Sequence, residues 1–194
     1  AHENTVLNQI KTQMLEDDED KYGDLIEWIE TITEYKIDGM KIEGHRNMID
    51  MLQLVRNYYY HSDMGGSNSI KKVLPAVMTG DAVKKKYSKP LGFGTHLKGR
   101  VLYEWDTETA KPKNPYSLLP SQYGNIDLSK DELILDDVEI NEGGAALIAY
   151  AKMQFTDMND IEREALRNAL LQYCELDTLA MVMIYEHWVA LTGL

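Results

Sequence analysis

The sequence contains almost no cysteine. Among its 194 residues there is one, Cys174, so no disulfide can form within the chain. Secreted domains stapled by disulfides are rich in cysteine, whereas a single thiol fits a reducing cytoplasm. The sequence offers Cys174 no convincing neighbouring base, and we interpret it as a small packed hydrophobe rather than a nucleophile. We therefore expect a cytoplasmic protein.

Long hydrophobic runs are also missing. No apolar stretch approaches the roughly 20 residues of a membrane-spanning helix, and LAMVMIY (179–185) is far shorter. No basic segment followed by an apolar one marks a signal peptide. We expect no membrane partner. The chain opens with AHENTVL and no initiating methionine, which we interpret as an excised or trimmed domain.

Several familiar catalytic and binding motifs are absent as well. No histidine is spaced from another histidine or a cysteine as in zinc fingers or zinc proteases. The glycine-rich stretch GFGTHLKG (92–99) lacks the strand-to-helix context of a phosphate-binding loop, and no G-x-S-x-G elbow occurs. With these motifs excluded, the carboxylates are the remaining candidates for catalytic or metal-binding residues.

Positive charge is scarce but concentrated. The chain has a net charge of −12, which argues against a protein that coats nucleic acid. Residues 70–100, however, carry eight Lys or Arg and one acid, Asp81. This gives the segment a charge of +7 and leaves −19 for the rest of the chain. Such a basic island can hold a phosphate backbone, although a solvated loop is the simpler interpretation from composition alone.

Apolar spacing predicts two helices in the first 35 residues, separated by the acidic stretch EDDEDKYGD (16–24). Asp38-Gly39 predicts a turn, and RNMIDMLQLVRNYYYH fits either a helix or a strand that leads into one. The stretch GGSNSIKKVLPAVM predicts a short helix that ends near Pro75.

The stretch GRVLYEWDTET predicts one arm of a hairpin. From Glu142 onward we expect helix, with a kink or break in the long run after Asn159 because that run exceeds 25 residues. No linker or repeat divides the chain, so we expect a single domain over residues 1–194.

Tyr173 and Asp177 lie four residues apart in LQYCELDTLAMV (171–182), which puts them on one helix face. The simple interpretation is a half-buried tyrosine and a solvated acid. A catalytic interpretation is also open. Mg²⁺ prefers oxygen ligands such as carboxylates, and two such ions about 4 Å apart can bind the attacking and leaving oxygens of a phosphodiester. A helix of this kind can supply one carboxylate while the tyrosine hydroxyl orients the attacking water.

The segment ALLQYCELDTLAMVMIYEHW resembles the third motif of DEDD-type 3′–5′ exonucleases of the tyrosine subclass. Together with GSNSIKKVLPAVM, NPYSLLP and EGGAALIAYAKMQF, it resembles the bacterial family called domain of unknown function 2779 over nearly the whole chain. That family often follows a predicted RecB-type nuclease region. The resemblance implies an α/β, RNase H-like fold, of which the portion present here is helix-dominated with few short strands.

The resemblance assigns roles to particular residues. Asp177 matches the metal-binding aspartate of the third motif and Tyr173 its tyrosine, while Glu3 takes the acid position of the second motif with Leu7 four residues later. Mg²⁺ or Mn²⁺ is the implied cofactor. Asp50 resembles an acid that follows the second motif, although a cap or strand end explains it better. The lysines expected to steer a nucleic-acid backbone are Lys71, Lys72, Lys84, Lys85 and Lys86. For Lys71, an exposed lysine is the simpler interpretation.

The first motif, D-x-E, is the main departure from the family. Asp106 and Glu108 have the right letters but fall between the second and third motifs, so we expect them at a hairpin end. The true first motif is then expected before Ala1. We expect the C-terminal part of a metal-dependent nuclease acting on DNA or RNA, with weak or no metal binding and little or no activity alone.

Two other interpretations stay open. One is a non-catalytic RNase H-like scaffold, or a protein- or nucleic-acid-binding module, that positions a neighbouring RecB-type nuclease region. The other is a domain that binds basic partners through its acidic faces, and only the net charge supports it.

Overall fold

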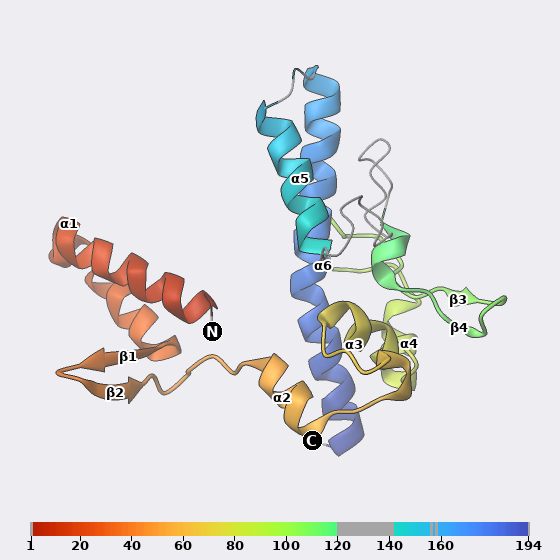
Figure 1. Cartoon of the computed structure of the whole chain (residues 1–194), viewed down its shortest axis with the longest axis horizontal. Helices are drawn as coiled ribbons and strands as arrows, with labels where there is room; N and C mark the ends of the chain where they lie inside the picture. Colours follow the sequence, from red (N-terminus) through yellow and green to blue (C-terminus); the bar gives the residue numbers. More distant parts are fainter. Residues whose placement is uncertain (1, 120–141, 156, 158, 194) are drawn as a thin grey trace. The chain divides into compact units, whose positions relative to one another are not determined.

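The computed structural model describes residues 2–119, 142–155, 157 and 159–193. Contacts divide the chain into two compact units, Ala1–Tyr58 and Tyr59–Leu194, and each is described by itself below. The described residues form six α-helices, two short 3₁₀ helices and two antiparallel sheets of two strands each (Figure 1). The expected dominance of helix with few short strands is therefore confirmed.

The first unit opens with α1 (His2–Ile32), which consists of two helices joined at a kink. At the kink, Asp18 leaves the helical conformation (φ −164°, ψ 98°), and its Oδ1 accepts a hydrogen bond from Lys21 N at 3.1 Å. An aspartate that accepts from a backbone amide in this way caps the helix that follows. The predicted break within residues 16–24 is confirmed.

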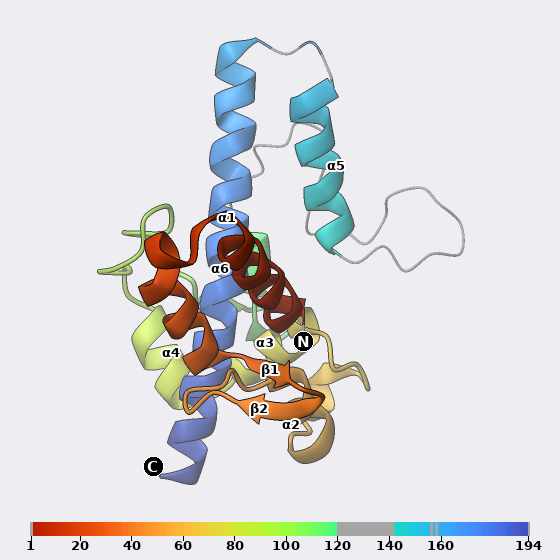
Figure 2. The same ribbon diagram turned by 90° about the vertical axis from the view of Figure 1, so that its left-hand side faces the viewer.

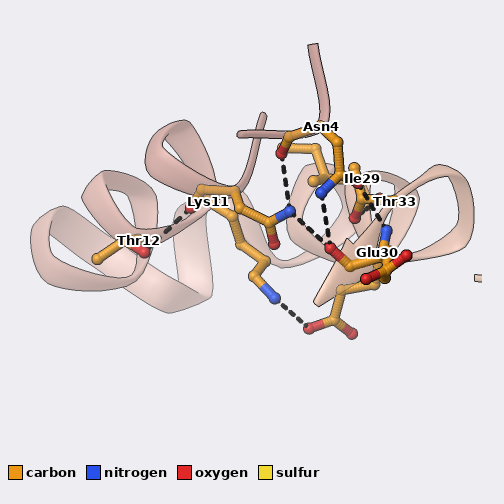
Figure 3. A network of polar contacts seen from close by, with 8 residues as sticks. Asn4, Lys11, Thr12, Ile29, Glu30 and Thr33 are labelled. Atoms are coloured by element: carbon orange, nitrogen blue, oxygen red, sulfur yellow. Dashed lines mark hydrogen bonds and ion pairs between the residues drawn. The ribbon is translucent and has the colours of Figure 1, made fainter. Parts of the chain in front are cut away.

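Side chains of the first half of α1 bind residues within its second half and just after it (Figure 3). Asn4 Oδ1 accepts from Glu34 N at 2.7 Å, and Asn4 Nδ2 donates to Glu34 O at 2.9 Å. Lys11 Nζ pairs with Glu30 Oε1 at 3.1 Å, and the buried Thr33 hydroxyl donates to Ile29 O. These bonds fix the start of the first sheet against α1.

Strands β1 (Glu34–Ile37) and β2 (Met40–Glu43) pair antiparallel through the predicted Asp38-Gly39 turn. Both turn residues have positive φ, 49° and 80°, as two-residue hairpin turns often require. The ambiguous stretch that follows is a helix, α2 (Met51–Tyr58). Asp50 Oδ1 accepts from Leu52 N at 2.9 Å, so Asp50 caps α2 as the simpler interpretation predicted.

The second unit is organised around α6 (Asp160–Thr192), against which α3 (Ile70–Val77) and α4 (Asp81–Tyr87) pack. The 3₁₀ helix η1 (Ser62–Met64) contacts α3. Ser69 caps α3 by accepting from Lys71 N at 3.3 Å. Fully buried core side chains of these elements and of the loops near residues 97 and 102 include Val73, Leu74, Ala76, Val77, Met78, Val83, Tyr87, Leu97, Leu102, Leu176, Ala180 and Met183.

Helix α3 ends at Val77, two residues after Pro75, so the predicted end near this proline is confirmed. Pro75 removes only its own N–H from the helix, and Met78 N still donates to Leu74 O at 3.1 Å. Ala76 and Val77 are completely buried. Burial of these two side chains therefore holds the last turn in place.

Helix α6 has 33 residues and no break, so the predicted kink was wrong. It contains neither glycine nor proline, the usual causes of a kink. Its buried residues follow steps of three and four without a gap, from Leu166 to His187. The stripe consists of Leu166, Ala169, Tyr173, Leu176, Ala180, Met183 and His187, and Leu179 and Ile184 beside it are buried as well. Because this stripe is continuous, packing supports one unbroken helix.

Helix α5 (Glu142–Phe155) confirms the helix expected from Glu142 and lies along the first half of α6 (Figure 2). Among the described residues, no helix combines the length and apolar character needed to cross a membrane.

The second sheet is the predicted hairpin, formed by β3 (Trp105–Asp106) and β4 (Lys111–Pro112). Asp106 Oδ1 accepts from Glu108 N at 2.9 Å and Oδ2 from Thr109 Oγ1 at 2.8 Å. These hydrogen bonds lower the pKa of Asp106, that to Thr109 most. Asp106 therefore shapes the turn, and the expectation that this D-x-E sequence marks a hairpin end is confirmed.

Candidate functional site

Tyr173 and Asp177 lie one turn apart on α6, as their spacing predicted. Tyr173 belongs to the buried stripe, and 4% of its surface is exposed. The side chain of Asp177, at the edge of the stripe, is 41% exposed. The helix therefore presents a buried phenol beside a carboxylate that solvent can reach.

Lys71 joins these two residues from another helix. Its Nζ donates to Tyr173 Oη at 3.0 Å and lies 3.3 Å from Asp177 Oδ1. Lys71 stands in the first turn of α3, where the Ser69 cap fixes the backbone. Its side chain is only 14% exposed, so the simpler interpretation of an exposed lysine was wrong.

Tyr116 completes the cluster, and sequence reasoning did not select it. It lies in the 3₁₀ helix η2 (Pro115–Leu118), capped by Asn114, and its hydroxyl donates to Asp177 Oδ1. Its ring centroid is 5.8 Å from that of Tyr173. NPYSLLP contributed to the family resemblance, and its Asn-Pro pair marks a capped turn, but neither signal points to the tyrosine hydroxyl.

The Lys71 ammonium is enclosed by π-faces as well as by oxygen atoms. It lies 3.0 Å from the ring centroid of Tyr116 and 4.3 Å from that of Tyr173. Ring faces attract a cation most strongly where water is displaced. The four residues Lys71, Tyr116, Tyr173 and Asp177, called here the Asp177 cluster, thus form a site that holds a positive charge against one carboxylate.

The hydrogen-bond directions define what the cluster can do chemically. Tyr173 Oη accepts from Lys71, which leaves its hydroxyl hydrogen for an acceptor other than the ammonium. Asp177 Oδ1 accepts the hydrogen bond from the Tyr116 hydroxyl, and the same oxygen forms the ion pair with Lys71. A phenol and a carboxylate are thereby held in fixed orientation beside solvent.

Glu175, two residues before Asp177, binds the glycine-rich loop at residues 92–99. Its two carboxylate oxygens accept from Thr95 N at 2.9 Å and from His96 N at 2.6 Å. Gly94 has φ +91°, and a Cβ at this position would lie 2.2 Å from Glu175 Oε1. The loop therefore holds a carboxylate of the chain itself, an arrangement that the sequence did not predict.

The other predicted site residues are all exposed. Glu3 is an exposed residue in the first turn of α1, in the first unit. Lys72 is exposed on α3, and Lys84, Lys85 and Lys86 are exposed on α4. Lys86 forms an ion pair with Glu186.

Cys174 does not have the packed position that we expected. It is exposed on α6, because it lies beside the buried stripe rather than on it. Partial burial and, to a smaller degree, the charge of Asp177 raise the pKa of its thiol. A raised pKa lowers the fraction of thiolate, which is the reactive form of the side chain.

The Asp177 cluster does not fit a divalent metal ion as it stands. Its one carboxylate already faces an ammonium 3.3 Å away, and that positive charge opposes the binding of a second cation at the same oxygen. Within residues 2–119, 142–155 and 159–193, no group of three or more His, Cys, Asp or Glu side chains could hold a metal ion.

Comparisons with family models, with curated proteins and with solved structures find no match to this chain.

Proposed function

We propose that this chain is the C-terminal part of an RNase H-like, DEDD-type nuclease and contributes Asp177 and Tyr173 to its active site. One observation carries the proposal: Lys71 Nζ lies within 3.0 Å of Tyr173 Oη and 3.3 Å of Asp177 Oδ1. The sequence analysis named all three residues as candidates, in two segments about 100 positions apart, and their side chains are in contact.

The roles follow from the resemblance and from the contacts. Asp177 is the carboxylate that the intact site would use as a ligand for Mg²⁺ or Mn²⁺, and Glu3 is a proposed second ligand. Tyr173 orients water through its hydroxyl, and Lys71 is placed to hold that hydroxyl or a substrate phosphate. In this chain alone the Lys71 ammonium already balances Asp177, so we expect weak metal binding and little or no hydrolysis.

The test compares the full gene product with this chain on 3′-labelled single strands in Mn²⁺. We expect the full product to cleave and Asp177→Asn to reduce cleavage at least about a hundredfold, because removing one catalytic group typically costs that much. This chain should show little or no activity. The matched control is Glu164→Gln, an exposed carboxylate on the same helix, which should cleave as wild type.

Two outcomes would contradict the proposal. Cleavage that survives Asp177→Asn in the full product would remove Asp177 from the active site. Robust cleavage by this chain alone that depends on Asp177 would show that the chain is not a partial site.

The second candidate is a non-catalytic RNase H-like scaffold or binding module beside a RecB-type nuclease region. One observation favours it, since the charge of Asp177 is compensated by Lys71 within the chain. In that case Asp177→Asn would lower the free energy of unfolding and leave cleavage by the full product unchanged. For either candidate we propose a cytoplasmic location, on the ground of the single cysteine.

A further inference from the structure

Helix α4 exposes three consecutive lysines. Val83 and Tyr87 are buried and fix the inner side of this short helix. Successive residues are rotated by about 100° around a helix axis, so Lys85 lies opposite the core while Lys84 and Lys86 lie to either side of it. The three ammonium groups therefore spread over the outer surface of α4.

An exposed aromatic ring borders the lysines on each side. Trp105, on strand β3, is 49% exposed, and the Lys84 ammonium lies 5.9 Å from its ring centroid. Phe93, in the glycine-rich loop, is 46% exposed, and the Lys86 ammonium lies 5.5 Å from its ring centroid. We call Lys84, Lys85, Lys86, Phe93 and Trp105 the α4 surface.

Within the part of the chain that the structure describes, most of the basic residues near this surface have no ion-pair partner. Lys86 pairs with Glu186, and Glu104, next to Trp105, pairs with Lys113. Lys84 and Lys85 form no ion pair with any residue that the structure describes, and the same holds for three other basic residues of the following loop: Lys89, Lys98 and Arg100. A chain with a net charge of −12 thus keeps a local basic face.

The two features together identify the kind of ligand. Lysines attract a phosphate backbone, and exposed aromatic rings stack on bases at about 1–3 kcal/mol per base. In a duplex the base faces are covered by their neighbours, so rings of this kind favour unpaired bases. An acidic peptide would satisfy the lysines but would leave Trp105 and Phe93 without a stacking partner.

We propose that the α4 surface binds single-stranded nucleic acid, with Trp105 and Phe93 as stacking platforms and Lys84 and Lys85 as backbone contacts. The inference rests on the proposed nuclease for its biological purpose. It concerns residues outside the Asp177 cluster and predicts binding without metal, so each proposal can fail separately.

The experiment measures fluorescence anisotropy of a labelled oligo(dT) strand of about 12 nucleotides, and of a duplex of the same length, in EDTA at low salt. We expect the single strand to bind more tightly than the duplex. Trp105→Ala and Phe93→Ala should each weaken single-strand binding about tenfold, which is the loss of one stacked base. Trp105→Phe keeps an aromatic face and should retain most of the affinity.

Two controls separate stacking and charge from general effects. Trp28→Ala removes a tryptophan of matching exposure, 48%, from the first unit and should leave binding unchanged. Changing Lys84 and Lys85 to Gln should reduce the slope of log K against log salt by about 1.4, because each phosphate contact to a single strand contributes about 0.7.

The proposal is overturned if the duplex binds as tightly as the single strand, if Trp28→Ala weakens binding as much as Trp105→Ala, or if oligo(dT) does not bind at low salt. Equal affinity for a poly-glutamate peptide would also overturn it. Binding is measured in EDTA, where no metal-dependent cleavage can take place, so loss of the nuclease proposal would not affect this result.

Discussion

His187 ends the buried stripe of α6 in tight surroundings. Its Nε2 lies 3.3 Å from Tyr59 Oη, and a Cβ on Gly80 would come within 2.5 Å of its Nδ1. Burial lowers the pKa of His187 below its ordinary value of 6.5, and the nearby His61 acts in the same direction. The folded protein therefore disfavours the protonated form of this imidazole.

A dependence of stability on pH follows for this residue. In the unfolded chain His187 binds a proton near pH 6.5, whereas in the folded chain it does so only at lower pH. The free energy of unfolding should therefore fall as the pH is lowered from about 6.5 toward the folded pKa. Urea unfolding at a series of pH values measures this, and His187→Gln should flatten the dependence in that window.

The exposed His45 provides the control for that measurement. His45→Gln should leave the pH profile as it is in the wild type. A profile that His187→Gln does not change would show that other groups cause any acid sensitivity.

Some single residues were predictable from their neighbours alone. Asp18, Asp50, Ser69 and Asp106 each bind a backbone amide two or three positions ahead, and such short-range bonds depend on local sequence. Tyr116 was not predictable, because its partner Asp177 lies 61 positions away. Only the packing of η2 against α6 brings that pair together.

At the scale of elements, Glu175 ties α6 to the glycine-rich loop. We expect Gly94→Ala to lower the free energy of unfolding by about 1–3 kcal/mol, because it combines a strained positive φ with a steric conflict at Glu175. The amide protons of Thr95 and His96 should also exchange faster. Denaturant unfolding and hydrogen exchange measure the two effects.

Gly92, in the same loop, has open space at its Cβ position. Gly92→Ala should therefore leave both stability and exchange close to wild type. Equal effects of the two substitutions would show that the loop tolerates no added methyl group, and that the Glu175 contact is not the cause.

The elements also show where sequence patterns stop being informative. The apolar periodicity of α6 was readable, but helix length alone suggested a break that continuous packing removes. The end of α3 near Pro75, by contrast, followed from the sequence. In α6 a local rule was outweighed by contacts with other elements.

At the scale of the whole molecule, all four residues of the Asp177 cluster belong to the second unit. The second unit also has its own buried core, which includes Leu74, Leu97 and Met183. We expect residues 59–194, expressed alone, to unfold in a single cooperative transition, followed by circular dichroism in urea. The substitution Tyr116→Phe then tests whether the isolated unit still forms the Asp177 cluster.

In both the isolated unit and the whole chain, Tyr116→Phe removes the hydrogen bond to Asp177 and should lower the free energy of unfolding by a similar amount, about 1 kcal/mol. A gradual, non-cooperative transition of residues 59–194 would show that this unit depends on the first 58 residues.

The unbroken course of α6 has a mechanical consequence. At 33 residues and about 1.5 Å per residue, the helix is a rod of about 50 Å. One end lies against α5, while Tyr173 and Asp177 sit near the middle. Because α6 has no kink between its contact with α5 and these two residues, we expect a tilt of α5 to shift the phenol and the carboxylate as well.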